Sequence, residues 1–180
     1  MEWKRAVTKT ILEQLEKEES VRMVITKSPN AITISEDGVA KAIFKIKREK
    51  TLTIYTDGSC LGNPGSGGWA IYCEQTKESE GGGILQTTNN RMEATAVLKA
   101  LEYAKRKNAN SIKICSDSRL IVEQTNGNWR INKNKDIMDK IMSLKKEFEK
   151  LEISWIKGHD GNDLNERVDN LAKEEAKAIS

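Results

Sequence analysis

The sequence predicts an α/β domain built on a mixed β-sheet, preceded by a small α+β unit. Short runs rich in β-branched and aromatic residues occur at 51–56, 68–74 and 81–87, and the turns between them are short enough for an antiparallel meander. From residue 89 onward, helical patterns alternate with two further strand-like runs. The first 50 residues follow a different pattern, so we divide the chain into a small unit at 1–48 and a larger domain at 51–180.

The N-terminal unit is predicted to contain one helix and a β-hairpin. Apolar residues recur at helical spacing over 5–18, and a short β-prone run covers 21–26. Two strand-like runs, 31–35 and 39–46, flank the segment 36–38, where Asp-Gly is a strong signal for a hairpin turn. A unit of this size buries only a small core. The charged residues 47–50 form its boundary with the larger domain.

In the larger domain the elements after the meander alternate between helix and strand. Met92, Ala96, Leu98, Ala100, Leu101 and Ala104 form a buried stripe on the first helix. Asp163 is the predicted N-cap of the last helix, with Glu166 as its capping-box partner. The predicted helices are 89–107, 118–125, 134–149 and 163–178, and the predicted strands are 111–116 and 151–157.

Composition indicates a protein of a reducing compartment. The chain has 180 residues, enough to bury a core without disulfides. Cys60, Cys73 and Cys115 are odd in number and lack metal-ligand spacing, which favours free thiols. No apolar run approaches the ~20 residues of a membrane span, and the N-terminus lacks the apolar core of a signal peptide. We expect a cytoplasmic protein that does not contact a membrane.

The charge of the chain is distributed unevenly. Residues 1–50 hold 11 Lys/Arg against 8 Asp/Glu, whereas residues 51–180 hold 19 of each. The whole excess of +3 therefore lies in the N-terminal unit, which is a weak indication of a nucleic-acid contact there.

Four acidic residues stand at the ends of predicted elements. Asp57 follows the first strand of the meander, just before a Gly-Asn-Pro-Gly turn cluster, and Asp117 follows the strand 111–116. Glu93 and Asp169 lie in the early turns of two helices. An isolated Asp-Gly usually just ends a strand in an Asx-turn, and acids are usually solvated. If the two strands are adjacent and parallel, however, both aspartates emerge at one sheet edge. Carboxylates gathered there favour Mg²⁺ or Mn²⁺ over Zn²⁺.

Five sequence blocks resemble a known family, and they occur in that family's order over residues 51 to about 178. The blocks are Asp57-Gly-Ser-Cys-x-Gly-Asn-Pro-Gly, Thr87-Thr-Asn-Asn-Arg-Met-Glu93, Ser116-Asp117-Ser118, Lys157-Gly158-His159 and Asn165-Glu-Arg-x-Asp169. Together they closely resemble type 1 ribonuclease H. The resemblance implies a ribonuclease H-like fold: a five-stranded mixed sheet of three antiparallel and two parallel strands, flanked by helices. The N-terminal unit resembles no motif.

The resemblance also implies an activity and its metal ions. The family cuts the RNA strand of RNA–DNA hybrids endonucleolytically, leaving 5′-phosphate and 3′-hydroxyl ends. Two Mg²⁺ ions about 4 Å apart activate the attacking water and stabilise the leaving oxygen, so no protein nucleophile is needed; Mn²⁺ can substitute. The metal-binding carboxylates carry over to Asp57, Glu93, Asp117 and Asp169, with Asp57 bridging the ions. His159 matches a mobile loop histidine that helps proton transfer or product release, although a lone histidine is more often structural or simply exposed.

Substrate contacts implied by the resemblance lie in the same blocks. Cys60, Asn63, Asn89 and Asn90 match minor-groove contacts, Thr88 with Asn63 matches a contact to a DNA-strand phosphate, and Asn165 matches a residue that orients water or phosphate. Turn and helix capping is the alternative role for these asparagines. Many family members carry glutamine where this chain has Arg119, so that position becomes a phosphate contact or loses its groove contact. The family's Lys/Trp-rich insertion is replaced by a short connection, in which Trp129 either stacks on a sugar or fills the core.

Three functions and two roles for the N-terminal unit remain open from the sequence. The first function is a monomeric, metal-dependent ribonuclease H acting on RNA–DNA hybrid. The second is a nucleic-acid-binding module of a larger machine without catalytic activity, and the third is cleavage of another duplex, such as a chimeric RNA–DNA junction. The unit at 1–48 either contacts nucleic acid or docks a protein partner. The basic residues in question are Lys41, Lys45, Lys47, Arg48 and Lys50.

Overall fold

The computed structural model describes residues 23–27, 31–36, 39–45, 51–158 and 160–180. The chain separates into two compact units, Met1–Arg48 and Glu49–Ser180. None of the described helices is both long and apolar enough to cross a membrane.

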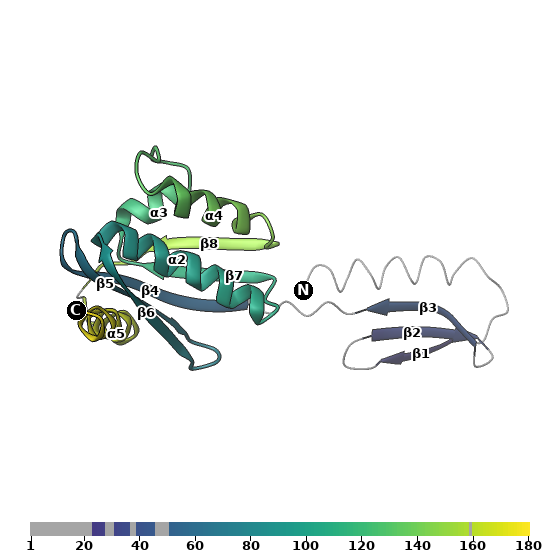
Figure 1. The fold of residues 1–180 in the computed structure, drawn as a ribbon. Helices are drawn as coiled ribbons and strands as arrows, with labels where there is room; N and C mark the ends of the chain where they lie inside the picture. Colours follow the sequence, from purple (N-terminus) through teal and green to yellow (C-terminus); the bar gives the residue numbers. More distant parts are fainter. Residues whose placement is uncertain (1–22, 28–30, 37–38, 46–50, 159) are drawn as a thin grey trace. The chain divides into compact units, whose positions relative to one another are not determined.

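The described part of the N-terminal unit is a three-stranded antiparallel sheet in the order β1–β2–β3 (Figure 1). Its strands are β1 (Met23–Lys27), β2 (Ala31–Glu36) and β3 (Val39–Lys45). Glu36 pairs with Val39, which agrees with the predicted hairpin. The predicted helix at 5–18 and the basic residues Lys47, Arg48 and Lys50 lie outside the described residues, whereas Lys41 and Lys45 lie on β3.

The larger unit is built on a five-stranded mixed sheet in the order β6–β5–β4–β7–β8 (Figure 1). The strands are β4 (Thr51–Gly62), β5 (Gly65–Cys73), β6 (Ser79–Thr87), β7 (Ser111–Ser116) and β8 (Lys150–Trp155). β4, β5 and β6 are antiparallel neighbours, whereas β7 is parallel to β4 and β8 is parallel to β7. The predicted fold of three antiparallel and two parallel strands is confirmed.

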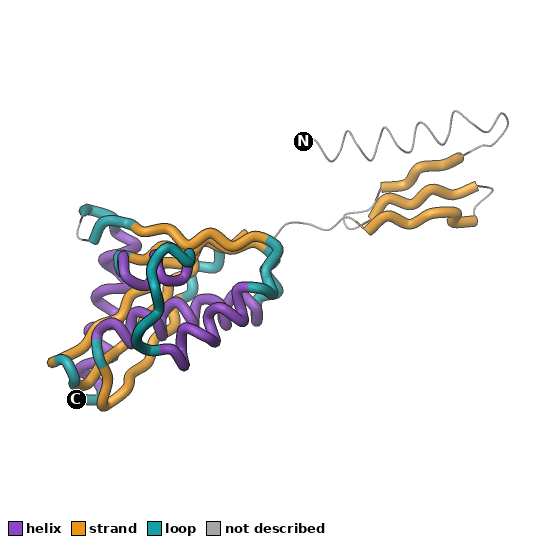
Figure 2. Tube along the Cα trace, turned by 90° about the horizontal axis from the view of Figure 1, so that it is seen from above, coloured by secondary structure: helices purple, strands orange, loops and turns teal. Residues whose placement is uncertain are grey.

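Helices cover both faces of this sheet (Figure 1, Figure 2). α2 (Asn89–Arg106), α3 (Arg119–Thr125) and α4 (Lys135–Lys145) lie on one face, and α5 (Asp163–Ala178) lies on the other. The larger core, with Ile54, Leu101, Ile114 and Ile141, lies between the sheet and α2–α4. All six residues of the predicted stripe on α2 are buried. Ala70, Tyr72, Val168 and Ala172 form a smaller core under α5.

Glycines on β5 and β6 allow α5 to approach the sheet closely. A Cβ atom on Gly68 would lie 2.1 Å from the backbone oxygen of Ala172, and one on Gly83 would lie 2.6 Å from the Ile179 side chain. Real Cβ atoms never come so near a backbone atom, so position 68 requires glycine. The glycine-rich strands therefore set the height at which α5 lies on the sheet.

One predicted helix cap and one predicted helix end are wrong, whereas the predicted range 163–178 of the last helix is confirmed. The last helix is capped by Asn162, whose side chain accepts hydrogen bonds from the backbone N–H groups of Leu164 and Asn165, so Asp163 is the first helical residue and not the N-cap. The fourth predicted segment, 134–149, is helical only as far as Lys145. Beyond it, the backbone N–H of Glu149 donates to the Asn110 oxygen, which turns the chain into β8.

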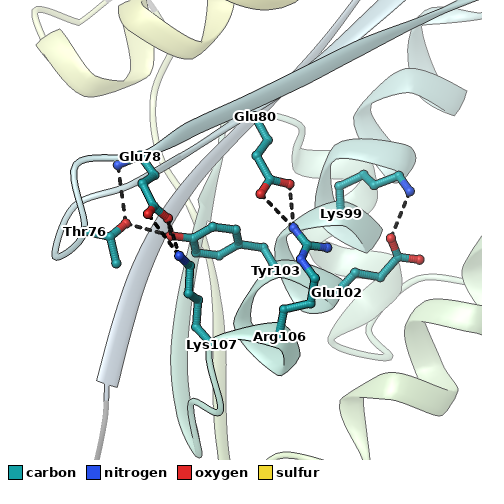
Figure 3. A network of polar contacts seen from close by, with 8 residues as sticks. All are labelled: Thr76, Glu78, Glu80, Lys99, Glu102, Tyr103, Arg106 and Lys107. Carbon is teal, nitrogen blue, oxygen red and sulfur yellow. Dashed lines mark hydrogen bonds and ion pairs between the residues drawn. The ribbon is translucent and has the colours of Figure 1, made fainter.

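A polar network ties the β5–β6 turn to the C-terminal turns of α2 (Figure 3). The hydroxyl of the buried Tyr103 lies 2.6 Å from Thr76 Oγ1 and donates to a carboxylate oxygen of Glu78. Lys107 pairs with Glu78, and Arg106 pairs with Glu80, both at 2.6 Å. Burial, followed by the hydrogen bond to Glu78, raises the pKa of Tyr103, so this hydroxyl stays a donor.

We expect Tyr103→Phe to destabilise the protein by about 1 kcal/mol, because a hydrogen bond to a buried hydroxyl typically contributes this much. In a protein of this size the melting temperature should fall by roughly 2–4 °C. Glu80→Gln is the matched control, since it removes only an exposed ion pair of the same network and should change the melting temperature less. Equal melting temperatures for Tyr103→Phe and the parent would show that the hydroxyl does not hold the turn.

Candidate active site

Asp57 lies inside a strand, not at its end as the sequence suggested. β4 continues to Gly62, and Asp57 pairs with Ala70 of β5. The glycines after Asp57 do not begin the turn, because they are paired with β5 and the turn comes only at Gly62–Gly65. On the other side, the parallel pairing with β7 ends where Thr56 meets Ser116. Asp57 and Asp117 are the next residues of the two strands, so they emerge together, as predicted.

Gly58 brings helix α2 against this part of β4. A Cβ atom on Gly58 would lie 2.1 Å from the backbone nitrogen of Glu93 and 2.2 Å from the carbonyl carbon of Met92. Only glycine permits such an approach of strand and helix backbones. The contact fixes Glu93, in the second turn of α2, beside Asp57.

The four acids are close enough to influence one another's ionisation. Burial raises the pKa of Asp57 to about 8, and the negative charges of Asp117, Asp169 and Glu93 add to this, against the lowering effect of the Gly58 backbone hydrogen bond. Burial also raises the pKa of Glu93, opposed by a hydrogen bond from Ser118. Asp169 thus acts on Asp57 from α5, on the other side of the sheet from α2. The four carboxylates predicted from the sequence converge.

Protein donors hold three of these carboxylates. Glu93 accepts hydrogen bonds from Ser118 Oγ at 2.6 Å and from Asn89 Nδ2 at 3.0 Å. Asp117 accepts one from Asn165 Nδ2 at 3.4 Å, and Asp169 Oδ2 lies 2.6 Å from Lys173 Nζ. Among the described residues, no three His, Cys, Asp or Glu side chains are already arranged as a set of metal ligands.

The residues nevertheless fit a hard divalent cation. All four are oxygen donors, the ligands that Mg²⁺ and Mn²⁺ prefer. In addition, Asn165 is buried at 2% exposure and its side-chain oxygen has no hydrogen-bond partner. A buried oxygen without a donor is costly, so its position beside Asp117 suits a water molecule or a cation.

Five of the seven predicted substrate residues lie around the N-terminus of α2, whereas Arg119 begins α3 and Asn165 lies on α5. Asn63 Oδ1 accepts from the backbone N–H of Asn89 at 3.3 Å, so Asn63, not Asn89, satisfies this helix end. Thr88 is the N-cap of α2, but its side chain makes no capping hydrogen bond. Cys60 donates to the Thr87 oxygen at 3.5 Å, and Asn90 is exposed. The side chains of Thr88 and Asn90 are thus not used to cap the helix.

Arg119 and Trp129, which follow Asp117 in the sequence, form an exposed pair. The Arg119 guanidinium lies 6.0 Å from the centre of the Trp129 ring. Trp129 is 45% exposed, so the interpretation of this residue as a core plug is wrong. His159 lies outside the described residues; next to it, Lys157 pairs with Asp160 at 3.0 Å.

Sequence reasoning missed three residues that position the acids. Ser118 holds Glu93, Lys173 holds Asp169, and the Trp155 indole donates to the backbone oxygen of Asp117 at 3.0 Å. Ser118 directly follows Asp117, and Lys173 is four residues after Asp169 on a predicted helix, a spacing that itself indicates a pair. No sequence signal points to Trp155.

We expect the stability of the metal-free protein to fall as the pH rises from about 4 to about 8. The pKa of Asp57 is raised from 3.8 to about 8, so in this range the folded state binds more protons than the unfolded state and stability decreases with pH. Asp57→Asn should flatten this decrease, as followed by melting temperature in EDTA. Asp163→Asn, which changes an exposed acid of α5, is the control and should show the same decrease in stability with pH as the parent. The same slope in Asp57→Asn and the parent would show that the pKa of Asp57 is not raised by its burial and its acidic neighbours.

The chain resembles known proteins over the same region. Residues 49–177 match the model of the family described as RNase H. Ribonuclease H of Syntrophus aciditrophicus is 39% identical over an alignment of 145 residues, which spans 71% of this chain and 82% of that protein. For ribonuclease HI of Neisseria meningitidis the identity is 38% over 147 residues, spanning 73% of this chain and 99% of that protein. A solved structure of LC11-RNase H1 in complex with RNA/DNA hybrid has a TM-score of 0.63 and 30% identity, over 72% of this chain and 99% of that chain. The protein belongs to the ribonuclease H family.

Proposed function

We propose that this chain hydrolyses the RNA strand of RNA–DNA hybrids endonucleolytically, leaving 5′-phosphate and 3′-hydroxyl ends. The observation that carries the proposal is the convergence of Asp57, Glu93, Asp117 and Asp169 where the parallel pairing of β4 with β7 ends, in a sheet of the ribonuclease H family. A similar family member was solved in complex with RNA/DNA hybrid, which supports the substrate.

The four acids are the proposed ligands of two Mg²⁺ ions, for which Mn²⁺ can substitute. When bound, such ions activate the attacking water and stabilise the leaving 3′-oxygen. Asn165 supports this chemistry from the protein side. Its Nδ2 group orients Asp117, and its unpartnered Oδ1 is available to accept a hydrogen bond from water. His159, which precedes α5 in the sequence, is proposed to assist proton transfer or product release.

The hybrid is proposed to lie across the N-terminus of α2. The side chains of Cys60, Asn63, Asn89 and Asn90 would face the minor groove, where the 2′-hydroxyls distinguish RNA from DNA. Thr88 suits a contact to a DNA-strand phosphate for two reasons. The backbone N–H groups at a helix N-terminus favour an anion, and the Thr88 hydroxyl is not used in capping. Asn89 also donates to Glu93, so the same side chain is a proposed groove contact and the hydrogen-bond partner of a proposed metal ligand.

Arg119 is proposed as a phosphate contact rather than a groove contact. Its side chain is 68% exposed, and the ion pair with Glu123 is long, at 3.9 Å. The adjacent Trp129 ring offers a flat apolar surface to a sugar. An exposed arginine beside an aromatic ring suits the backbone of a nucleic-acid strand.

A binding module without catalysis is the less favoured function. Four mutually repelling carboxylates raise the free energy of the folded state, and binding a polyanion gives no reason to keep them. We further propose that the protein acts as a monomer in the cytoplasm. The free thiols of Cys60, Cys73 and Cys115 fit a reducing compartment.

Asp57→Asn should abolish cleavage of hybrid in Mg²⁺ while the protein remains folded. The substitution removes the acid whose ionisation the other three oppose, and so also relieves their repulsion. The measurement uses end-labelled hybrid, double-stranded RNA, single-stranded RNA and chimeric duplexes. Asp163→Asn should cleave hybrid at the parent rate. If the parent protein binds hybrid but does not cleave it, the function is that of a binding module. If the parent prefers the chimeric duplex, the substrate is a chimeric junction and not a uniform hybrid.

Removal of residues 1–49 tests the nucleic-acid role of the N-terminal unit. The remaining residues, 50–180, hold 20 Lys/Arg against 19 Asp/Glu, and relatives matched over 99% of their length lack a comparable extension. We expect the truncated protein to keep its catalytic rate constant but to bind hybrid more weakly. Its affinity should also depend less steeply on salt, because fewer phosphates are neutralised. Equal affinity and equal salt slope would leave docking of a protein partner as the role of this unit.

A further inference from the structure

Lys173 forms an ion pair with one of the four acids, Asp169. Its Nζ atom lies 2.6 Å from Asp169 Oδ2, one helical turn along α5. Among the ion pairs of the described residues, Asp169 is the only one of the four acids that takes part. The other three meet neutral donors: the backbone of Gly58 at Asp57, Asn89 and Ser118 at Glu93, and Asn165 at Asp117.

The surroundings of this pair distinguish it from an ordinary surface pair. Exposed i,i+4 pairs contribute little, because water screens both charges. Here the Asp169 side chain is only 16% exposed, and its charge acts on Asp57 together with those of two other acids. A positive charge at this point therefore offsets the repulsion of the whole group and not of one carboxylate alone.

The lysine end of the pair is free to leave. The Lys173 side chain is 44% exposed, and its ammonium sits on a flexible four-carbon stem. Rotation of the stem would carry the ammonium into solvent and uncover Asp169 Oδ2 without any movement of α5.

We propose that Lys173 is a built-in counterion, which holds Asp169 in the metal-free protein and is exchanged for the divalent cation that Asp169 binds. This rests on the metal site of the proposed function. Lys173 is a positioning residue, since it acts through Asp169. The lysine charge stabilises the empty cluster and lowers the affinity for metal, so binding replaces one cation by another.

The test compares Mg²⁺ binding and thermal stability of the full-length chain. Lys173→Met removes the charge but keeps a similar apolar stem, and Lys173→Arg keeps the charge. Lys177→Met is the matched control, because it removes a lysine from the same helix one turn further along, where the side chain is exposed. Calorimetric titration with Mg²⁺ gives the affinity, and melting in EDTA and in saturating Mg²⁺ gives the stability. Neither readout requires substrate.

Lys173→Met should bind Mg²⁺ about tenfold more tightly, since an ammonium ~6 Å from a divalent ion in a water-like dielectric opposes binding by about this factor. In EDTA it should melt below Lys177→Met, and saturating Mg²⁺ should close the gap. Lys173→Arg should behave as the parent. If Lys173→Met does not fold in EDTA, recovery of its fold by Mg²⁺ supports the exchange, and Lys173→Gln, with a neutral donor, supplies the affinity.

These measurements distinguish two ways in which the proposal can fail. In the first, the parent binds Mg²⁺, Lys173→Met and Lys173→Gln bind it equally well, and both variants melt like Lys177→Met. This result overturns the exchange but leaves the metal site intact. A parent protein that does not bind Mg²⁺ at all overturns the metal site of the proposed function and the exchange with it.

Discussion

Mutual repulsion of four carboxylates is the constraint on which the structure of this site depends. The fold brings them together in two ways: parallel pairing of β4 with β7 ends just before Asp57 and Asp117, and glycine at position 58 lets α2 press Glu93 against the strand. Each acid then needs a partner. The backbone of Gly58, hydrogen bonds from Ser118, Asn89 and Asn165, and the ammonium of Lys173 supply them. Protein donors therefore hold the acids at the places where a divalent cation would act.

The same contacts link the proposed groove to the proposed metal site. Asn63 binds the backbone of Asn89, and the Asn89 side chain binds Glu93, so the loop after β4 is connected to a metal ligand through one asparagine. A hybrid that engages these side chains would compete for the donors that now hold Glu93. Substrate and metal ions are thus expected to replace internal partners of the same acids.

Much of the fold follows from local patterns, whereas element ends do not. β-Branched runs and the 3.6-residue period identified the strands and helices of the larger unit, and the resemblance supplied their order in the sheet. The length of β4 was underestimated, because a glycine-rich segment after Asp57 looks like a turn although β5 pairs with it as far as Gly65. The N-cap at Asn162 was placed one residue late, since two adjacent residues, Asn162 and Asp163, both make good caps. Of the site, the acids were visible in long sequence blocks, but their partners depend on side-chain contacts across elements: nothing in the sequence indicates that Trp155 reaches the backbone of Asp117.

The measurement that tests the central claim most directly is the titration of Asp57 itself, by carbon-detected NMR of its labelled carboxyl group in the metal-free protein. Burial and the three neighbouring acids predict a midpoint at about pH 8, well above the ordinary value of 3.8. Added Mg²⁺ should move the midpoint down, because a bound cation favours the ionised carboxylate. A midpoint close to 3.8 without metal would contradict the account, since it would show that the four acids do not share one site.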